Sequence, residues 1–139
     1  MVNILIIGGS GCVGQETTDW LLNQNKVKKI ICVSRGKTRI PQRDSIIYEI
    51  ADITDCSSIL KVPKNHEITH ILHTAALRTT ACKANPEAAV KININGTINV
   101  LEAIRSYGKI KRLVFTSTAA VYKVPESGKF VNEEQVTSP

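Results

Sequence analysis

A short apolar run followed by regularly spaced glycines opens this chain and restricts what it can fold into. Residues 4–7 read Ile-Leu-Ile-Ile, glycines stand at Gly8, Gly11 and Gly14, and a helical pattern comes next. This order predicts a buried parallel strand that turns directly into a helix. Gly8 would permit the tight turn, Gly11 the close approach of a ligand, and Gly14 close packing of helix on strand. Because N–H groups and the positive end of the helix dipole meet at such a turn, we expect it to bind a diphosphate.

Short apolar runs and helical patterns alternate along the rest of the chain. Strands are predicted at residues 3–7, 29–34, 45–50, 69–74 and 112–116, helices at 11–25, near 57–60 and at 86–107, and a loop at 36–44. Such alternation favours a doubly wound α/β fold, with a parallel sheet of order 3-2-1-4-5 and helices on both faces. Residues 1–139 are therefore expected to form one domain that binds its ligand at the carboxyl ends of the strands, between strands one and four.

The composition excludes several other classes of protein. Lys and Arg number 18 against 12 Asp and Glu, but they are scattered and aromatic residues make up only 4%, so we expect no nucleic-acid partner. No apolar run approaches the ~20 residues that a membrane span needs, and no leader sequence is recognisable, so we expect a cytoplasmic protein. No C-x-x-C pair is present, which predicts reduced thiols and no metal site at the cysteines, namely Cys12, Cys32, Cys56 and Cys82.

The end of the second predicted strand bears on which dinucleotide is bound. A site that prefers NAD usually places an acidic residue there, on the ribose 2′-hydroxyl. This chain has Ser34 and Arg35 instead, 20 positions beyond Gly14. A hydroxyl and a guanidinium suit a 2′-phosphate, which a carboxylate would repel. The pattern favours NADP over NAD; the alternative interpretation is an exposed arginine in a turn.

Five segments together resemble the N-terminal part of the extended short-chain dehydrogenases/reductases, the NAD-dependent epimerase/dehydratase family. They occur in the family's order and spacing and span essentially the whole chain: 8–14 (GGSGCVG), 51–55 (ADITD), 73–76 (HTAA), 93–102 (NINGTINVLE) and 114–122 (VFTSTAAVY). The resemblance implies a Rossmann-type NAD(P)-binding domain and redox chemistry at a secondary alcohol or ketone, including epimerisation or dehydration of nucleotide sugars.

The resemblance also implies roles for individual residues. Asp52 and Ile53 would hold the adenine, Asn93 would be a structural or proton-relay residue, and the Thr118 hydroxyl would hydrogen-bond the reacting oxygen of the substrate. Taken singly, Asp52 could be a turn former, Asn93 a polar helix residue and Thr118 a strand-end residue. The remaining implied cofactor contacts are Gly8, Ser10, Gly11, Cys12, Val13 and Gly14 at the phosphates, Ala75 and Ala76 at the ribose and phosphates, and Thr116 and Ser117 at the nicotinamide.

The family's proton-transfer pair, a tyrosine and a lysine in Y-x-x-x-K on a helix, is not recognisable in this chain. The literal match, Tyr107 to Lys111, precedes the last predicted strand and contains Gly108, which should end the helix. We therefore expect the pair beyond Pro139 and the chain to be catalytically incomplete. The alternative is a non-catalytic NAD(P)-binding or sensing module that pairs with a partner chain. Uncovered apolar surface beside the 86–107 helix would favour self-association, for example as a homodimer.

Overall fold

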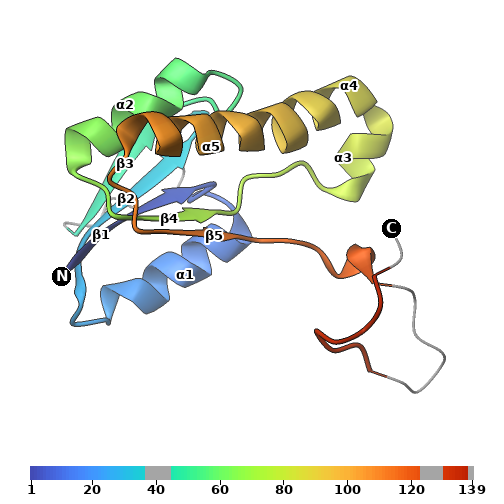
Figure 1. The fold of residues 1–139 in the computed structure, drawn as a ribbon, viewed down its shortest axis with the longest axis horizontal. Helices are drawn as coiled ribbons and strands as arrows, with labels where there is room; N and C mark the ends of the chain where they lie inside the picture. Colours follow the sequence, from blue (N-terminus) through green and yellow to red (C-terminus); the bar gives the residue numbers. More distant parts are fainter. Residues whose placement is uncertain (37–44, 123–129, 138–139) are drawn as a thin grey trace.

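Five parallel strands form one sheet in the order β3-β2-β1-β4-β5 (Figure 1). The computed structural model describes residues 1–36, 45–122 and 130–137. Most of the predicted loop at 36–44 therefore lies outside the described residues. The strand order and the parallel pairing confirm the predicted doubly wound fold. The strands are β1 (Val2–Ile7), β2 (Val27–Ser34), β3 (Ile46–Ile50), β4 (His70–His73) and β5 (Arg112–Phe115).

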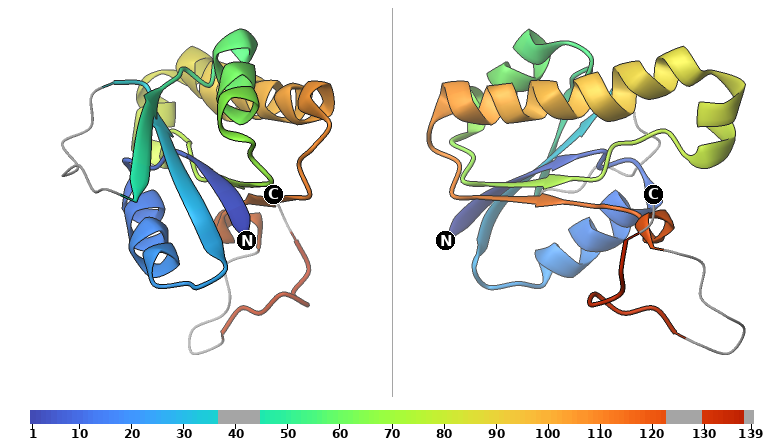
Figure 2. Two further views of the ribbon diagram at one scale, coloured as in Figure 1. Left: turned by 90° about the vertical axis from the view of Figure 1, so that its left-hand side faces the viewer. Right: turned by 45° about the vertical axis from the view of Figure 1, so that its right-hand side comes forward.

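Helices cover both faces of the sheet (Figure 2). One face carries α1 (Cys12–Leu22), and the other carries α2 (Cys56–His66) and α5 (Gly96–Tyr107). Helix α1 is shorter than the predicted 11–25, whereas α2 is longer than the predicted 57–60 because it continues through a buried Pro63. The sequence pattern did not reveal α3 (Thr79–Ala84), since this six-residue helix buries no side chain that would give it a period.

The predicted 86–107 helix is continuous but not uniform. It begins as α4 (Pro86–Ala89), passes through a π-helical turn at Val90–Asn95, and continues as α5. Asn85 caps its beginning, since the Asn85 side chain accepts a hydrogen bond of 2.9 Å from the Ala88 amide. Its side facing the sheet carries Gly96, Val100 and Ala103, so small residues bring it close to the strands.

Strand β1 lies at the centre of the core because it pairs with both β2 and β4. Its side chains alternate between the two faces, as the pleat requires. Leu5 and Ile7 belong to the cluster under α2 and α5, while Ile4 and Ile6 belong to the cluster under α1. Full burial of each such side chain stabilises the fold by roughly 1.5–3 kcal/mol. The near-continuous apolar run is therefore explained by burial on both faces.

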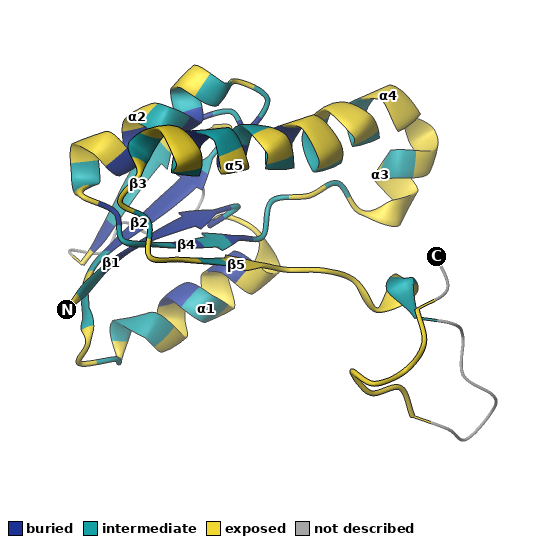
Figure 3. Cartoon of the chain, viewed as in Figure 1, coloured by how far each residue is buried: buried dark blue, intermediate teal, exposed yellow. Residues whose placement is uncertain are grey.

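The chain leaves the body of the domain after β5 (Figures 1 and 3). A single turn of 3-10 helix at Ala119–Val121 follows, and Tyr122 forms an isolated bridge with Thr137. Residues 123–129 lie outside the described residues. Among the residues that the structure describes, no helix combines the length and the apolar character needed to cross a membrane.

His73 at the end of β4 is fully buried beneath the long helix. Its Nε2 lies 3.2 Å from the Thr97 hydroxyl, and its ring packs at 5.3 Å against Phe115. No partner for Nδ1 is found among the described residues. Burial lowers the pKa of the His73 imidazole from its ordinary 6.5, because a charged ring here would lose its hydration.

His73 should make the fold less stable at low pH. Below pH 6.5 the unfolded chain takes up a proton that the folded chain does not, so the free energy of unfolding falls as the pH drops through this window. One such proton gives a slope of at most about 1.4 kcal/mol per pH unit. Urea titrations from pH 7.5 to 5 should show a shallower slope of the unfolding free energy against pH for His73→Gln than for the unaltered chain. Equal slopes in the two proteins would contradict this.

Candidate functional site

The glycine turn after β1 is held against the ends of both neighbouring strands. Gly8 adopts a φ of 93°, which favours glycine, and its N–H donates to the Val33 carbonyl of β2 at 3.0 Å. A Cβ at Gly8 would lie 2.7 Å from the Ala75 nitrogen and from the Thr74 hydroxyl. The turn therefore sits between the carboxyl ends of β2 and β4, at the switch point predicted from the strand order.

Gly14 allows α1 to approach this turn closely. A Cβ added here would lie 2.4 Å from the Gly8 carbonyl oxygen and 2.8 Å from the Gly9 Cα. The buried Thr18 hydroxyl donates to the Gly14 carbonyl at 2.7 Å and lies 3.5 Å from Cys32 Sγ on β2. The role expected for Gly14, close packing of helix on strand, is confirmed by these contacts.

The beginning of α1 is bare of side chains, as expected. Gly11 is its N-cap residue and makes no side-chain cap. The first N–H groups of the helix therefore face outward with the positive end of the dipole, an arrangement that suits an anion. The Gln15 side-chain amide donates a hydrogen bond of 2.8 Å to the Ser10 carbonyl. The geometry fits a diphosphate, because the first N–H groups of α1 are left without a side-chain cap at the glycine turn.

A cavity of about 200 Å³ opens at this turn, small against the ~300–1,000 Å³ of sites that enclose whole ligands. The predicted cofactor contacts that line it are Gly8, Ser10, Gly11, Ser34, Arg35, Ile53, Ala75 and Ala76. The sequence analysis missed other lining residues, most of which stand at or just after the end of a strand. Only this position in the fold could have identified them: Ile7, Val33, Ala51, Thr74, Leu77 and Ile92.

The segment after β3 closes one side of the cavity. The Asp52 carboxylate accepts hydrogen bonds from the Thr54 amide and hydroxyl at 2.8 and 2.9 Å. The hydrogen bond from the Thr54 backbone amide is the largest cause that holds the pKa of Asp52 below its ordinary 3.8. The positive charge of the nearby Arg35 guanidinium lowers this pKa further. Ile53, which is buried, is fixed by the Asn99 side-chain amide, which donates to its carbonyl at 2.9 Å. Asp52 does not line the cavity but fixes the loop that does.

Asn93 holds the opposite wall without touching the cavity. It lies in the π-helical turn and grips the backbone of Leu77 at two points. Its Oδ1 accepts from the Leu77 amide at 2.7 Å, and its Nδ2 donates to the Leu77 carbonyl at 3.1 Å. The π-helix is a common device at functional sites. Here it positions a side chain that fixes residue 77 beside the cavity.

The predicted nicotinamide and substrate contacts do not join the cavity. Thr116, Ser117 and Thr118 are all exposed on the segment that leaves the sheet. The Thr116 hydroxyl donates to the His73 carbonyl at 3.2 Å, and the Thr118 hydroxyl accepts from the Ala120 amide at 3.2 Å. Cys12 and Val13 lie in the first turn of α1, beside the cavity rather than in its lining.

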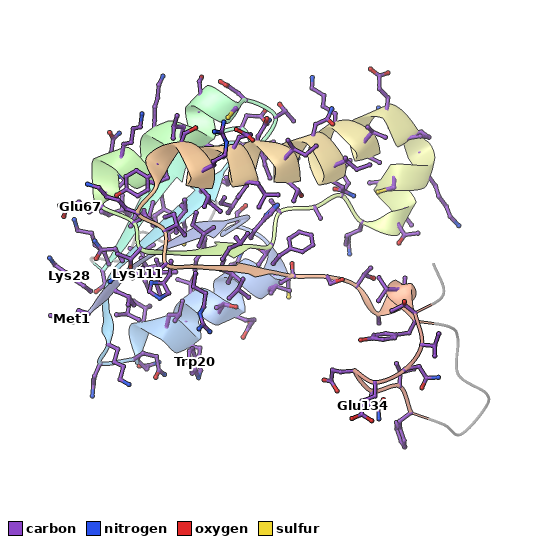
Figure 4. All side chains as sticks on the ribbon, viewed as in Figure 1. Met1, Trp20, Lys28, Glu67, Lys111 and Glu134 are labelled. Atoms are coloured by element: carbon purple, nitrogen blue, oxygen red, sulfur yellow. The ribbon has the colours of Figure 1, made fainter. Side chains whose placement is uncertain are left out.

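The Y-x-x-x-K match at Tyr107 is not a catalytic pair. Helix α5 ends at Tyr107, so Lys111 is not on the same helix. Lys111 precedes β5 and lies at the amino end of the sheet, opposite to the cavity (Figure 4). The ammonium of Lys109, not Lys111, lies over the Tyr107 ring, 6.0 Å from its centroid.

The fold and the glycine cradle define a Rossmann-type nucleotide-binding domain. Residues 4–139 match the model of the NAD dependent epimerase/dehydratase family. The chain belongs to this family. It is 31% identical over 140 residues to UDP-glucose 4-epimerase of Bacillus subtilis, with 94% of this chain and 40% of the relative covered.

Solved structures agree with this assignment. L-threonine dehydrogenase from Clostridium difficile superimposes with a TM-score of 0.83 at 28% identity, covering 100% of this chain and 43% of that one. UDP-glucose 4-epimerase from Thermus thermophilus, solved in complex with NAD, gives 0.83 at 26% identity, with coverages of 99% and 44%. The chain therefore spans about two fifths of the length of these relatives.

Replacing Gly14 by Ala should destabilise the domain. The new Cβ meets backbone atoms at 2.4 and 2.8 Å, so α1 must move away from the turn. Overpacking of this kind costs about 1–3 kcal/mol, enough to outweigh the gain of roughly 1 kcal/mol in helix propensity. Gly36→Ala is the matched control because a Cβ there meets nothing within 4 Å. Chemical denaturation should separate the two, and a Gly14→Ala variant as stable as Gly36→Ala would contradict the packing argument.

Proposed function

We propose that this chain is the NAD(P)-binding portion of an oxidoreductase or nucleotide-sugar epimerase/dehydratase. The observation that carries the proposal is the cavity at the switch between β1 and β4, which the side-chain-free start of α1 adjoins. The relatives support it, since the family is NAD dependent and the Thermus thermophilus epimerase was solved with NAD. When bound, the dinucleotide supplies hydride transfer at its nicotinamide.

Different segments of the chain would bind different parts of the cofactor. The turn from Gly8 to Gly14 would hold the diphosphate through backbone N–H groups, and Ile53 with the loop fixed by Asp52 would hold the adenine. Ala75 and Ala76, which follow β4, would line the ribose and phosphates. Asn93 acts as a positioning residue, because it holds Leu77 rather than the cavity itself.

Arg35 supports a preference for NADP over NAD. It lines the cavity directly after β2, where NAD-preferring sites usually carry an acidic residue. The Ser34 hydroxyl donates its proton to the Gly36 carbonyl at 2.8 Å. Recognition of a 2′-phosphate would therefore rest on the Arg35 guanidinium, whose planar donors match phosphate oxygens.

The chain should bind NADPH more tightly than NADH, and Arg35→Ala should remove the difference. A hydrogen bond to a charged group contributes about 1.5–3 kcal/mol, so NADPH affinity should fall roughly tenfold or more while NADH affinity changes little. Isothermal titration calorimetry on the 139-residue chain measures both. Arg112→Ala, at the other end of the sheet, is the control for the loss of one positive charge. Tighter binding of NADH would overturn the preference, and no binding of either would overturn the proposed function.

The reaction class is proposed from the family and from one residue. Thr118 would hydrogen-bond the carbonyl or alcohol oxygen of the substrate, while no helical Y-x-x-x-K pair is present in the sequence to move the proton. A secondary alcohol or ketone, including a nucleotide sugar, fits this chemistry. The alternative function, a cofactor-binding or sensing module that pairs with another chain, shares the same cavity. Hydride transfer catalysed by this chain would exclude the module.

An apolar stripe on the long helix supports the proposal of a homodimer. Val90, Ile94, Ile98 and Leu101 are each about half exposed, between 48% and 55%. In an antiparallel pair centred near residue 96, Ile94 would face Ile98 of the partner subunit. Glu87 and Arg105, at equal distances from this centre, would then meet with opposite charge. A twofold axis near residue 96 would therefore pair the middle of the stripe with itself, as an interface between two identical copies requires.

Ile98→Glu should weaken self-association because it places a charge at the centre of this stripe. Sedimentation velocity over a range of concentrations should show a dimer for the unaltered chain and for the exposed control Ser106→Glu, and a monomer for Ile98→Glu. The cost of burying an unpaired carboxylate makes the shift large. A monomeric unaltered chain, or a dimer that survives Ile98→Glu, would refute the interface.

A further inference from the structure

One wall of the cavity is fixed by a side chain that does not reach the cavity. Leu77 lines the cavity, and Asn93 of the π-helical turn holds the Leu77 backbone by two hydrogen bonds, of 2.7 and 3.1 Å. Turns of this kind are rare within helices and occur frequently at functional sites. The contacts that fix the turn therefore also fix this wall of the cavity.

Thr97 stands in the first turn of α5 and bonds back to the π-helical turn. Its hydroxyl donates to the Asn93 carbonyl, four residues earlier, at 2.7 Å. A threonine hydroxyl has one proton, so this bond uses the only donor of the side chain. Towards any further partner the Thr97 oxygen can only accept a hydrogen bond.

His73 is that further partner, and its ring is therefore assigned one tautomer. The Nε2 atom lies 3.2 Å from the Thr97 oxygen, so Nε2 must carry the proton. Burial lowers the pKa of His73, which keeps the ring neutral at pH 7 with a single N–H group. The other nitrogen, Nδ1, is then a bare acceptor, and it has no partner in the described part of the chain.

His73 is itself held on several sides. Its carbonyl accepts hydrogen bonds from the Thr116 amide at 3.1 Å and from the Thr116 hydroxyl at 3.2 Å. Its ring packs against Phe115 and is fully buried. Strand β4, which ends at His73, pairs with β1 on one side and with β5 on the other. The π-helical turn is thus tied to a fixed point of the sheet.

We infer that Thr97 is a positioning residue for nucleotide binding, because it joins His73 to the turn from which Asn93 holds Leu77. The inference rests on the proposed function for its effect on affinity, whereas the bonds themselves need no ligand. The protons of this His73–Thr97–Asn93 relay all point one way, from Nε2 to the Thr97 oxygen and from that hydroxyl to the Asn93 carbonyl. Loss of the hydroxyl leaves the buried His73 N–H without its acceptor.

The first test compares variants of Thr97 by isothermal titration calorimetry with NADPH on the 139-residue chain. Thr97→Val should weaken binding about tenfold, the effect of one lost hydrogen bond to a buried group. Thr97→Ser keeps the hydroxyl and should bind within about threefold of the unaltered chain. Thr17→Val is the matched control, because the Thr17 hydroxyl on α1 also donates to a carbonyl four residues earlier, at 2.8 Å. Equal affinities for Thr97→Val and Thr17→Val would overturn the inference.

A second test asks whether Thr97 acts through Asn93. In an Asn93→Ala background, Thr97→Val should change the NADPH affinity by less than about threefold, because both substitutions release the same wall. A general loss of stability would instead make the two losses of affinity multiply. Multiplying losses, with urea titrations showing all variants folded, would overturn the role of Thr97 in positioning Leu77.

Two ligand-free measurements keep the relay testable by itself. Nitrogen NMR of the unaltered chain with ¹⁵N-labelled histidine should show the proton of the His73 ring on Nε2, and His73→Gln assigns the signal. Hydrogen exchange at the Leu77 amide should be faster in Thr97→Val than in Thr97→Ser. A proton on Nδ1, or equal exchange, would overturn the relay even if NADPH binds. If the unaltered chain binds no NADPH, the proposed function fails, and these two measurements still confirm or refute the relay.

Discussion

The contact between α1 and the turn after β1 is the constraint on which the site depends. The Gly8 carbonyl lies so close to Gly14 that even one methyl group between them would force the helix away. This approach aims the start of α1 at the ends of β2 and β4, where the cavity opens. The position of the cavity thus follows from the tight packing of the helix on the strand ends, which these two glycines allow.

The long helix differs from a simple amphipathic helix because it carries apolar residues on its exposed side as well as on its buried side. Its inner side combines the small residues Gly96 and Ala103 with Val100 and Ile104, while Val90, Ile94, Ile98 and Leu101 remain about half exposed. Burial against the rest of the domain fixes the position of the helix, and about half of the surface of each residue in the outer stripe stays exposed in one copy. The exposed part of the stripe would contribute a favourable free energy of burial only when another apolar surface packs on it.

The sequence predicted the strands, their order and the glycine turn because each depends on local signals. Apolar runs mark buried parallel strands, and Gly8 and Gly14 mark positions where a Cβ does not fit. The residues that line the cavity were predicted where a motif covers them, as at Arg35 and Ala75. Thr74 and Leu77 were missed, because only the meeting of strand ends in space gives them a role.

Three other features lay beyond sequence reasoning for physical reasons. The π-helical turn at Val90–Asn95 has more residues per turn than an α-helix, but it is only six residues long. The sequence pattern therefore predicted one regular helix over residues 86–107. The side of that helix that faces the sheet carries Gly96 and Val100, and the sequence analysis did not predict this orientation. The contacts of Thr118 depend on a segment that leaves the sheet, for which strand patterns carry no information.

The hydrogen bonds between Asn93 and Leu77 attach one wall of the cavity to the long helix. Leu77 follows β4 in the chain, yet two hydrogen bonds attach its backbone to the π-helical turn. Any tilt or shift of the long helix as a rigid body therefore carries this wall with it, while the glycine turn stays with β1. The distance between this wall and the glycine turn is therefore fixed by how the long helix packs on the sheet, and not by β4 alone.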